Sequence, residues 1–97
     1  MKPDAIIKVR FKTTAEGGRQ GPLIIGETPY GCPLFVEGEA FDCRLLVRAQ
    51  TLELGNAYEL PIKFLNPRAA LSKLSPGKPV ILWEGKRIAT GEVVRLV

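Results

Sequence analysis

Turn-forming residues interrupt this chain at short intervals, and this feature limits the folds that it can adopt. The 97 residues include 10 glycines and 8 prolines, spread along the whole length. Both residue types destabilise helix interiors, so a helical bundle is disfavoured. The turns instead separate short apolar segments at intervals of roughly 8–12 residues, which is the spacing typical of antiparallel sandwiches and barrels.

Between the turns, apolar residues alternate with polar ones, most clearly in residues 7–12, 41–48 and 58–64. Alternation of this kind places every second side chain on one face of a strand. We count six to eight such segments. We therefore expect an all-β fold, a small closed antiparallel barrel of about six strands, with residues 1–97 as a single domain. The predicted core is Ile7, Val9, Phe11, Phe41, Cys43, Leu45, Tyr58, Leu60, Ile62, Phe64, Val80, Leu82 and Val94.

Three segments depart from simple alternation. Residues 67–74 are the one helical candidate, because Asn66 suits the N-cap and Pro67 suits the first helical position. Residues 27–33 contain two prolines and are expected to form an irregular loop. Pro61 lacks a ladder donor, so its strand is expected to run along an edge or to carry a bulge there.

The last part of the chain carries two further strand signals. Residues 80–83 are apolar on both faces, so we expect them to form a central strand. Residues 88–97 are predicted to form the final strand, in which Gly91 marks a bulge or a close approach of two backbones.

Composition argues against most enzyme and metal chemistry. The chain has no histidine, which is the usual acid/base group near neutral pH and the commonest metal ligand. Two cysteines alone cannot complete a structural zinc site. Residues 26–31 have the glycine spacing of a phosphate-binding loop, but Cys32 and Pro33 stand where that loop needs Lys and Ser or Thr. We therefore expect no enzymatic activity and no nucleotide, metal or other cofactor.

The sequence also carries no sign of a membrane or secretory segment. No apolar run reaches the ~18 residues of a membrane span, and the N-terminal residues lack the apolar region of a signal peptide. We expect a cytoplasmic location with no membrane partner. There, Cys32 and Cys43 would be free and half-buried, with a disulfide as the alternative. The net charge of +4 permits nucleic-acid contact without demanding it, and residues 27–42 carry four carboxylates and no cation.

Two turns share the pattern E-G-x-R, one at residues 16–19 and the other at residues 84–87. In one interpretation the glycines supply the turn geometry and the charges are merely solvated. In the other, exposed Arg19 and Arg87 lie beside free backbone N–H groups, an arrangement that suits a phosphate. The residues alone leave both interpretations open. The candidate RNA- or partner-binding residues are Gly17, Gly18, Arg19, Glu84, Gly85 and Arg87.

Three stretches, in the same order, resemble the third domain of elongation factor Tu. Phe11–Gly26 resembles its first strand and E-G-G-R turn, with a glycine seven residues after the arginine. Leu60–Pro67 resembles a strand that ends in a proline turn. Leu82–Val94 resembles the closing hairpin, E-G-x-R-x-x-x-G-x-V-V. These three stretches are spread along nearly the whole length of the chain.

The resemblance implies a six-stranded antiparallel barrel without catalytic activity. In the parent factor this domain packs on the GTPase and second domains, contacts the T-stem backbone of aminoacyl-tRNA and offers a surface to the nucleotide exchange factor. Arg19, Glu84 and Gly85 match its tRNA-contacting turns, and Gly17 and Gly18 match residues that shape the first turn. If that contact is kept, the two turns should lie side by side, with Arg19 able to reach a phosphate.

The departures from the family concern mainly the RNA contacts. Thr28 and Tyr30 replace an Arg and an RNA-contacting Gln, Asn66 replaces a basic residue, and residues 68–78 are longer than the family's link. The chain also has no GTPase motif, so we expect a free-standing module. We expect it to bind a protein partner around translation, such as a translation factor, with weak tRNA binding. The alternative is a repurposed protein-interaction module of a regulatory or immunity type, with no RNA role.

Overall fold

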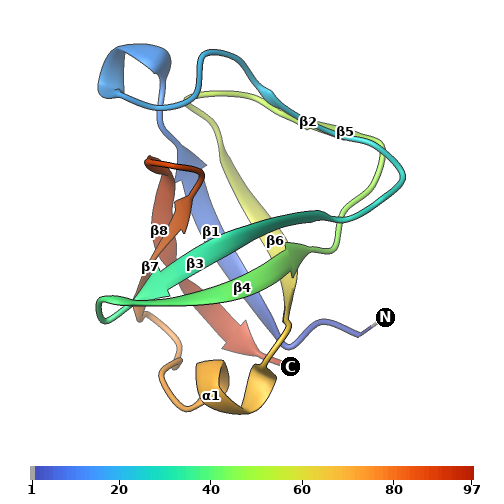
Figure 1. Ribbon diagram of the computed structural model, residues 1–97, viewed down its shortest axis with the longest axis vertical. Helices are drawn as coiled ribbons and strands as arrows, with labels where there is room; N and C mark the ends of the chain where they lie inside the picture. The colour runs from blue at the N-terminus through green and yellow to red at the C-terminus, as the bar shows by residue number, and fades with distance from the viewer. Residues whose placement is uncertain (1) are drawn as a thin grey trace.

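Six strands close into an antiparallel barrel in the computed structural model, which describes residues 2–97 (Figure 1). Around the barrel the strand order is β1-β6-β4-β3-β7-β8, and β8 pairs with β1 to close it. This confirms the predicted all-β class and the small closed barrel. The barrel strands are β1 (Ala5–Phe11), β3 (Tyr30–Val36), β4 (Glu39–Leu45), β6 (Ala57–Phe64), β7 (Pro79–Trp83) and β8 (Arg87–Leu96).

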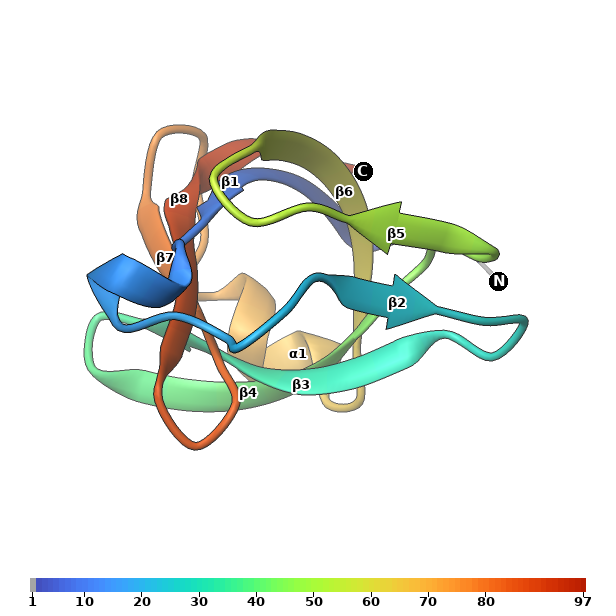
Figure 2. The ribbon, with the colours of Figure 1, turned by 90° about the horizontal axis from the view of Figure 1, so that it is seen from above.

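Two short strands form a separate ribbon at one end of the barrel. These are β2 (Leu23–Ile25) and β5 (Gln50–Leu52), which pair antiparallel. Viewed from above, the ribbon lies across the mouth of the barrel (Figure 2). Leu23, Ile25 and Leu52 are buried, whereas Ile24 is 73% exposed. The inner side of the ribbon therefore closes this end of the core.

The helix α1 (Pro67–Leu71) lies at the opposite end of the barrel (Figure 1). Pro67 begins it as predicted, but the side chain of Asn66 makes no cap hydrogen bond. The helix is shorter than predicted, because the amide of Leu74 bonds to the carbonyl of Leu71, three residues earlier. Within residues 2–97, no helix has both the length and the apolar character needed to cross a membrane.

Most of the predicted core is buried, with a correction in β8. Val93 is 1% exposed and belongs to the core, whereas Val94 is only half-buried. The cause is a bulge: the partner of Ile6 in β8 is Arg95, and the partner of Ile7 is Val93. The skipped residue is Val94, so the prediction that it faces inward is wrong. Of the other predicted core residues, Phe41 and Tyr58 are only partly buried and pack against the core.

Two prolines lie inside strands at positions that need no ladder donor. β3 begins at Tyr30, so the irregular loop predicted for residues 27–33 is wrong from there onward. Pro33 is opposite Asp42, whose carbonyl accepts from the Leu65 amide of the next segment instead of bonding to β3. The nitrogen of Pro33 therefore faces away from β4, toward β7. The β3–β7 ladder begins only at the next residue, Leu34, so Pro33 does not need to donate a hydrogen bond there.

Pro61 is neither on an edge strand nor at a bulge, contrary to the prediction. β6 lies between β1 and β4, and its register with β1 runs without a shift through Pro61. Pro61 instead lies where the β4–β6 ladder ends. Its carbonyl accepts from the Leu46 amide at 2.8 Å, and the missing donor falls beyond the last residue of β4.

The two cysteines are directly opposite each other in β3 and β4. Both are free thiols, and both are buried, not half-buried as expected. The Cys43 thiol donates to the Cys32 carbonyl at 3.3 Å. The neighbouring Cys32 and burial both raise the pKa of the Cys43 thiol, so it lacks the thiolate character of a reactive cysteine.

The close approach predicted at Gly91 is present. A Cβ on this residue would overlap the Lys8 carbonyl oxygen and lie 2.7 Å from the Cα of Val9. β1 and β8 are thus packed backbone to backbone. β7, predicted to be central, pairs with β3 on one side and with β8 on the other.

Candidate functional site

The first E-G-x-R turn is built around Glu16. A 3-10 turn over Thr14–Glu16 begins with a reciprocal cap, in which the Glu16 amide donates to Thr13 Oγ1 and the Thr13 amide donates to Glu16 Oε1. Arg10 Nη1 donates to the same carboxylate oxygen at 2.9 Å. The Thr13 amide, and next the Arg10 guanidinium, lower the pKa of Glu16 to about 2. Glu16 is thereby committed to the structure of its own turn.

The glycines of this turn fold it back against the end of β1. Gly17 has a φ of 88°, a left-handed conformation that suits glycine. Gly18 is buried, and its amide donates to the Thr13 carbonyl at 2.9 Å. A Cβ on Gly18 would overlap the Lys12 carbonyl oxygen. The first turn is therefore packed against β1, with no space for a larger residue at its centre.

The second E-G-x-R turn joins β7 to β8 and projects into open space. The Glu84 amide donates to the Lys86 carbonyl at 2.8 Å, and Gly85 has a φ of 70°. No atom lies within 4 Å of the position that a Cβ on Gly85 would take. Lys86 and Arg87 are exposed. Gly17 and Gly85, which share a position in the pattern, are alike, since both have a positive φ and open space around a Cβ. The two turns differ at the next position, where Gly18 is buried against β1 and Lys86 is exposed.

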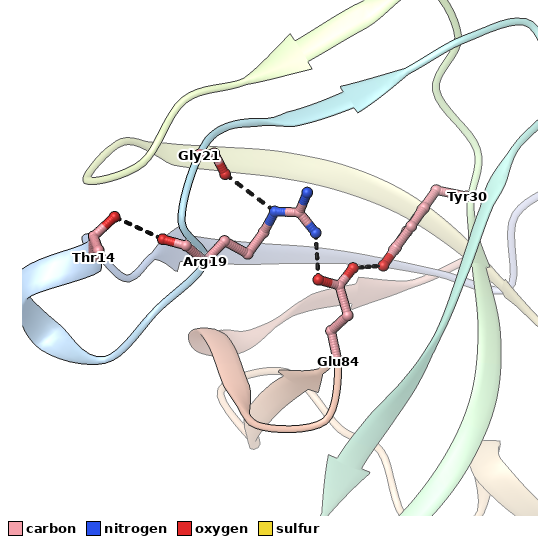
Figure 3. A network of polar contacts seen from close by, with 5 residues as sticks. All are labelled: Thr14, Arg19, Gly21, Tyr30 and Glu84. Carbon is pink, nitrogen blue, oxygen red and sulfur yellow. Dashed lines mark hydrogen bonds and ion pairs between the residues drawn. The ribbon is translucent and has the colours of Figure 1, made fainter.

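A polar network joins the two turns (Figure 3). Arg19 Nη1 forms an ion pair with Glu84 Oε1, and the Tyr30 hydroxyl donates to Glu84 Oε2. Arg19 Nε also donates to the Gly21 carbonyl at 3.2 Å, while Thr14 Oγ1 donates to the Arg19 carbonyl at 2.7 Å. The two turns, 65 residues apart in sequence at this contact, therefore lie side by side and are held there by side chains.

The network neutralises the cation that the sequence singled out. The side chain of Arg19 is 23% exposed and that of Glu84 is 37% exposed, and each faces the other. Arg19 and Glu84 thus meet as an internal pair and do not form two separate contact points. Arg87 lies outside this pair, and no ion pair involving it is found among residues 2–97.

Sequence reasoning missed Tyr30 as a member of the site. The only sequence signal for this residue is that Tyr30 stands where the elongation factor Tu third domain, which the chain resembles, has a glutamine. Tyr30 begins β3, which brings its hydroxyl to the β7–β8 turn (Figure 3). The replacement therefore coincides with a contact that ties β3 to both turns.

Part of the acidic segment lies at the other end of β3. Glu37 Oε2 pairs with Lys78 at 2.5 Å, and Glu39 Oε1 pairs with Lys73 at 3.1 Å. Lys78 lowers the pKa of Glu37, and Glu39 raises the pKa of Lys73. These two carboxylates are thus paired with nearby lysines, at the end of β3 remote from Tyr30.

No group of three or more His, Cys, Asp or Glu residues that could hold a metal ion occurs in the part of the chain that the structure describes. No protein-family model matches the chain, and no curated protein matches it either. What the geometry provides is a rim of two linked turns, the second of which carries the exposed cations Lys86 and Arg87.

Proposed function

We propose that the protein is a non-enzymatic binding module of the elongation factor Tu third-domain type, which acts in the cytoplasm around translation by contacting a protein such as a translation factor. The observation that carries this proposal is the Arg19–Glu84–Tyr30 network. It fixes two turns from opposite ends of the chain as one rigid unit at the rim of a closed barrel. A fixed surface of this kind loses little conformational entropy when a partner binds.

The same network argues against RNA as the main ligand. The electrostatic part of an RNA-backbone contact comes from cations that are free to meet phosphates. Arg19 is paired with Glu84, which leaves Lys86 and Arg87 as the exposed cations of the second turn. So few cations supply only a weak electrostatic association. We therefore assign tRNA a minor role.

A second candidate function is a regulatory or immunity-type module with an unrelated protein partner and no RNA role. It is favoured by Tyr30, which replaces an RNA-contacting residue of the resembling family and commits its hydroxyl to Glu84. The genomic neighbourhood separates the two candidates. A neighbouring toxin-like or secretion gene would favour the second.

The experiment is affinity capture from cell lysate with the immobilised protein, with and without ribonuclease, in which both proteins and RNAs are identified. Each captured protein is then purified and titrated against the barrel and two charge-reversal variants. Lys86→Glu changes the exposed second turn, and Arg68→Glu is the matched control on α1 at the other end of the barrel. The proposal predicts ribonuclease-resistant binding of a translation factor, weakened by Lys86→Glu only.

Two other outcomes would count against the proposal. An unrelated protein that binds with the same dependence on Lys86 would favour the second candidate function. Capture that disappears with ribonuclease would contradict both candidates, because the ligand would then be RNA.

A further inference from the structure

The outer face of β7 is apolar along its whole length. Val80 and Leu82 point into the core, so Pro79, Ile81 and Trp83 face outward. The solvent side of an antiparallel strand ordinarily carries polar residues, as the outward Lys8 and Arg10 of β1 do. Pro79 is exposed and Ile81 and Trp83 are half-buried, so this outer face is partly open to solvent. The apolar pattern of this strand is therefore not explained by the core.

The neighbouring strands extend this face into a groove. Phe35 of β3 is opposite Ile81, and its ring lies 5.3 Å from that of Trp83, centroid to centroid, at an interplanar angle of 53°. Gly38 and Glu37 line the groove beside Pro79, and Arg87 lines it beside Trp83. The hollow between these residues has a volume of about 350 Å³.

Of the two charged residues that line the groove, Glu37 is paired within residues 2–97 and Arg87 is not. Glu37 is already paired with Lys78 at 2.5 Å. Arg87 is opposite Trp83 in the β7–β8 register, and no carboxylate among the described residues pairs with it. The groove thus combines an apolar floor with one unneutralised cation at one end. Its complement is an apolar group next to an anion.

We propose that this groove binds an extended segment of a partner protein, which places apolar side chains against Phe35 and Trp83 and an acidic side chain on Arg87. The spacing supports an extended chain: Pro79, Ile81 and Trp83 recur at every second residue, over about 13 Å, which matches the alternate side chains of a peptide strand.

The groove is poorly suited to nucleic acid. The Phe35 and Trp83 rings are tilted and in contact, so they leave no parallel slot for a base. One free cation can meet only one phosphate. This inference rests on the proposed function, because it takes the partner to be a protein. It adds the place where one segment of that protein binds and the side chains that the segment must carry.

The test begins with a phage-displayed library of random peptides, selected on the wild-type protein after depletion on Trp83→Ala. We expect the enriched peptides to carry apolar residues at alternate positions and an acidic residue beyond them. Trp83 is the only tryptophan, so its indole N–H resonance reports on the groove alone. An enriched peptide, made synthetically, should shift this resonance.

A charge exchange then tests the role of Arg87. Arg87→Glu should weaken the acidic peptide about tenfold and should favour the same peptide with Lys in place of its acid. Lys86→Glu, the same charge reversal one residue earlier and outside the groove, should leave both affinities unchanged. Because Arg87 is exposed, this variant remains informative even if Trp83→Ala proves unstable.

Several outcomes would overturn the inference. They are a selection without enrichment, enriched peptides that lack an acid, and equal effects of Arg87→Glu and Lys86→Glu. A shift of the indole resonance by oligouridine, or a dimer that Trp83→Ala dissociates, would identify a different occupant. If a captured protein binds the rim but is insensitive to Arg87→Glu, the groove proposal fails while the proposed function stands. If no protein is captured but the peptide results hold, the proposed function fails while the groove proposal stands.

Discussion

The two E-G-x-R turns have nearly the same sequence and very different surroundings. In the first turn, Glu16 caps its own 3-10 turn and Gly18 packs against β1. In the second, Gly85 projects into open space and Lys86 is exposed. The glutamate of the second turn receives the arginine of the first. The first turn is thus used to build the rim, and the second is available for contact.

This difference shows that a repeated motif need not have a repeated role. Arg19 and Arg87 occupy the same place in the pattern, yet Arg19 is in an ion pair and Arg87 is not paired with any carboxylate of residues 2–97. A ligand-binding role inferred from the motif would assign both arginines alike. The contacts within residues 2–97 give Arg19 a structural role and leave Arg87 unpaired, which is why we propose a binding role for Arg87 alone.

The largest expected effect is that of Gly18→Ala, which tests whether the first turn is truly packed. The new methyl group would overlap the Lys12 carbonyl oxygen, so the turn or β1 must shift. We expect a loss in the free energy of unfolding toward the upper end of the roughly 1–3 kcal/mol typical of overpacking. Urea unfolding measures it. The control is Gly21→Ala, where no atom lies within 4 Å of the new Cβ, and a loss as large there would refute the assignment.

A glycine substitution in the second turn, Gly85→Ala, should cost less than Gly18→Ala. No atom would meet the methyl group, so only the left-handed φ of 70° opposes alanine, at about 1 kcal/mol. Gly85→Asn should recover part of this loss, because asparagine tolerates that conformation. Thermal unfolding of the three proteins decides the matter. A Gly85→Ala loss equal to that of Gly18→Ala would remove the contrast between the turns.

The ion pair that links the turns should contribute a smaller amount. Arg19 and Glu84 are both partly exposed, so a double-mutant cycle with Arg19→Ala and Glu84→Gln should give a coupling energy of roughly 0.2–1 kcal/mol. Arg87→Ala should change stability by less than about 0.5 kcal/mol. No coupling at all, or an Arg87→Ala loss larger than that of Arg19→Ala, would reverse the roles assigned to the two arginines.

The smallest effect concerns acid stability and the exposed Glu16. Its pKa is lowered from an ordinary 4.5 to about 2 in the folded protein. The stabilisation from its ionised form is therefore complete above pH 4.5 and is lost as the pH falls toward 2. Glu16→Gln should lower stability at neutral pH and flatten its dependence on pH over this interval. Chemical unfolding at several pH values measures it, and parallel curves for the two proteins would show that the cap is not formed.

The barrel could be predicted because alternation and turns are local signals. Residues 7–12 and 58–64 show their inward faces directly, and Gly91 marks the place where two backbones meet. Val94 was misassigned because a bulge reverses the facing of side chains without leaving a local trace. Pro61 was misassigned because an interior strand can tolerate proline where the neighbouring ladder ends.

The candidate site was less predictable because its contacts join distant segments. The pattern indicated two related turns, and they do lie together. However, nothing near Arg19 in the sequence shows that its partner is Glu84, since the two meet only when the barrel closes. The contribution of Tyr30 has the same origin, because it depends on where β3 begins.

The most direct test of the account is a titration of folded tRNA at physiological salt with the wild-type protein and Arg19→Ala. The ion pair with Glu84 commits Arg19 to the rim and not to a ligand. We predict that wild-type binding is undetectable or no tighter than about 10⁻⁴ to 10⁻⁶ M, the range of non-specific electrostatic association. Arg19→Ala, whose fold is checked by circular dichroism, should bind tRNA as weakly as the wild-type protein. Submicromolar binding that Arg19→Ala abolishes in a folded protein would contradict the account and would identify the module as a tRNA binder.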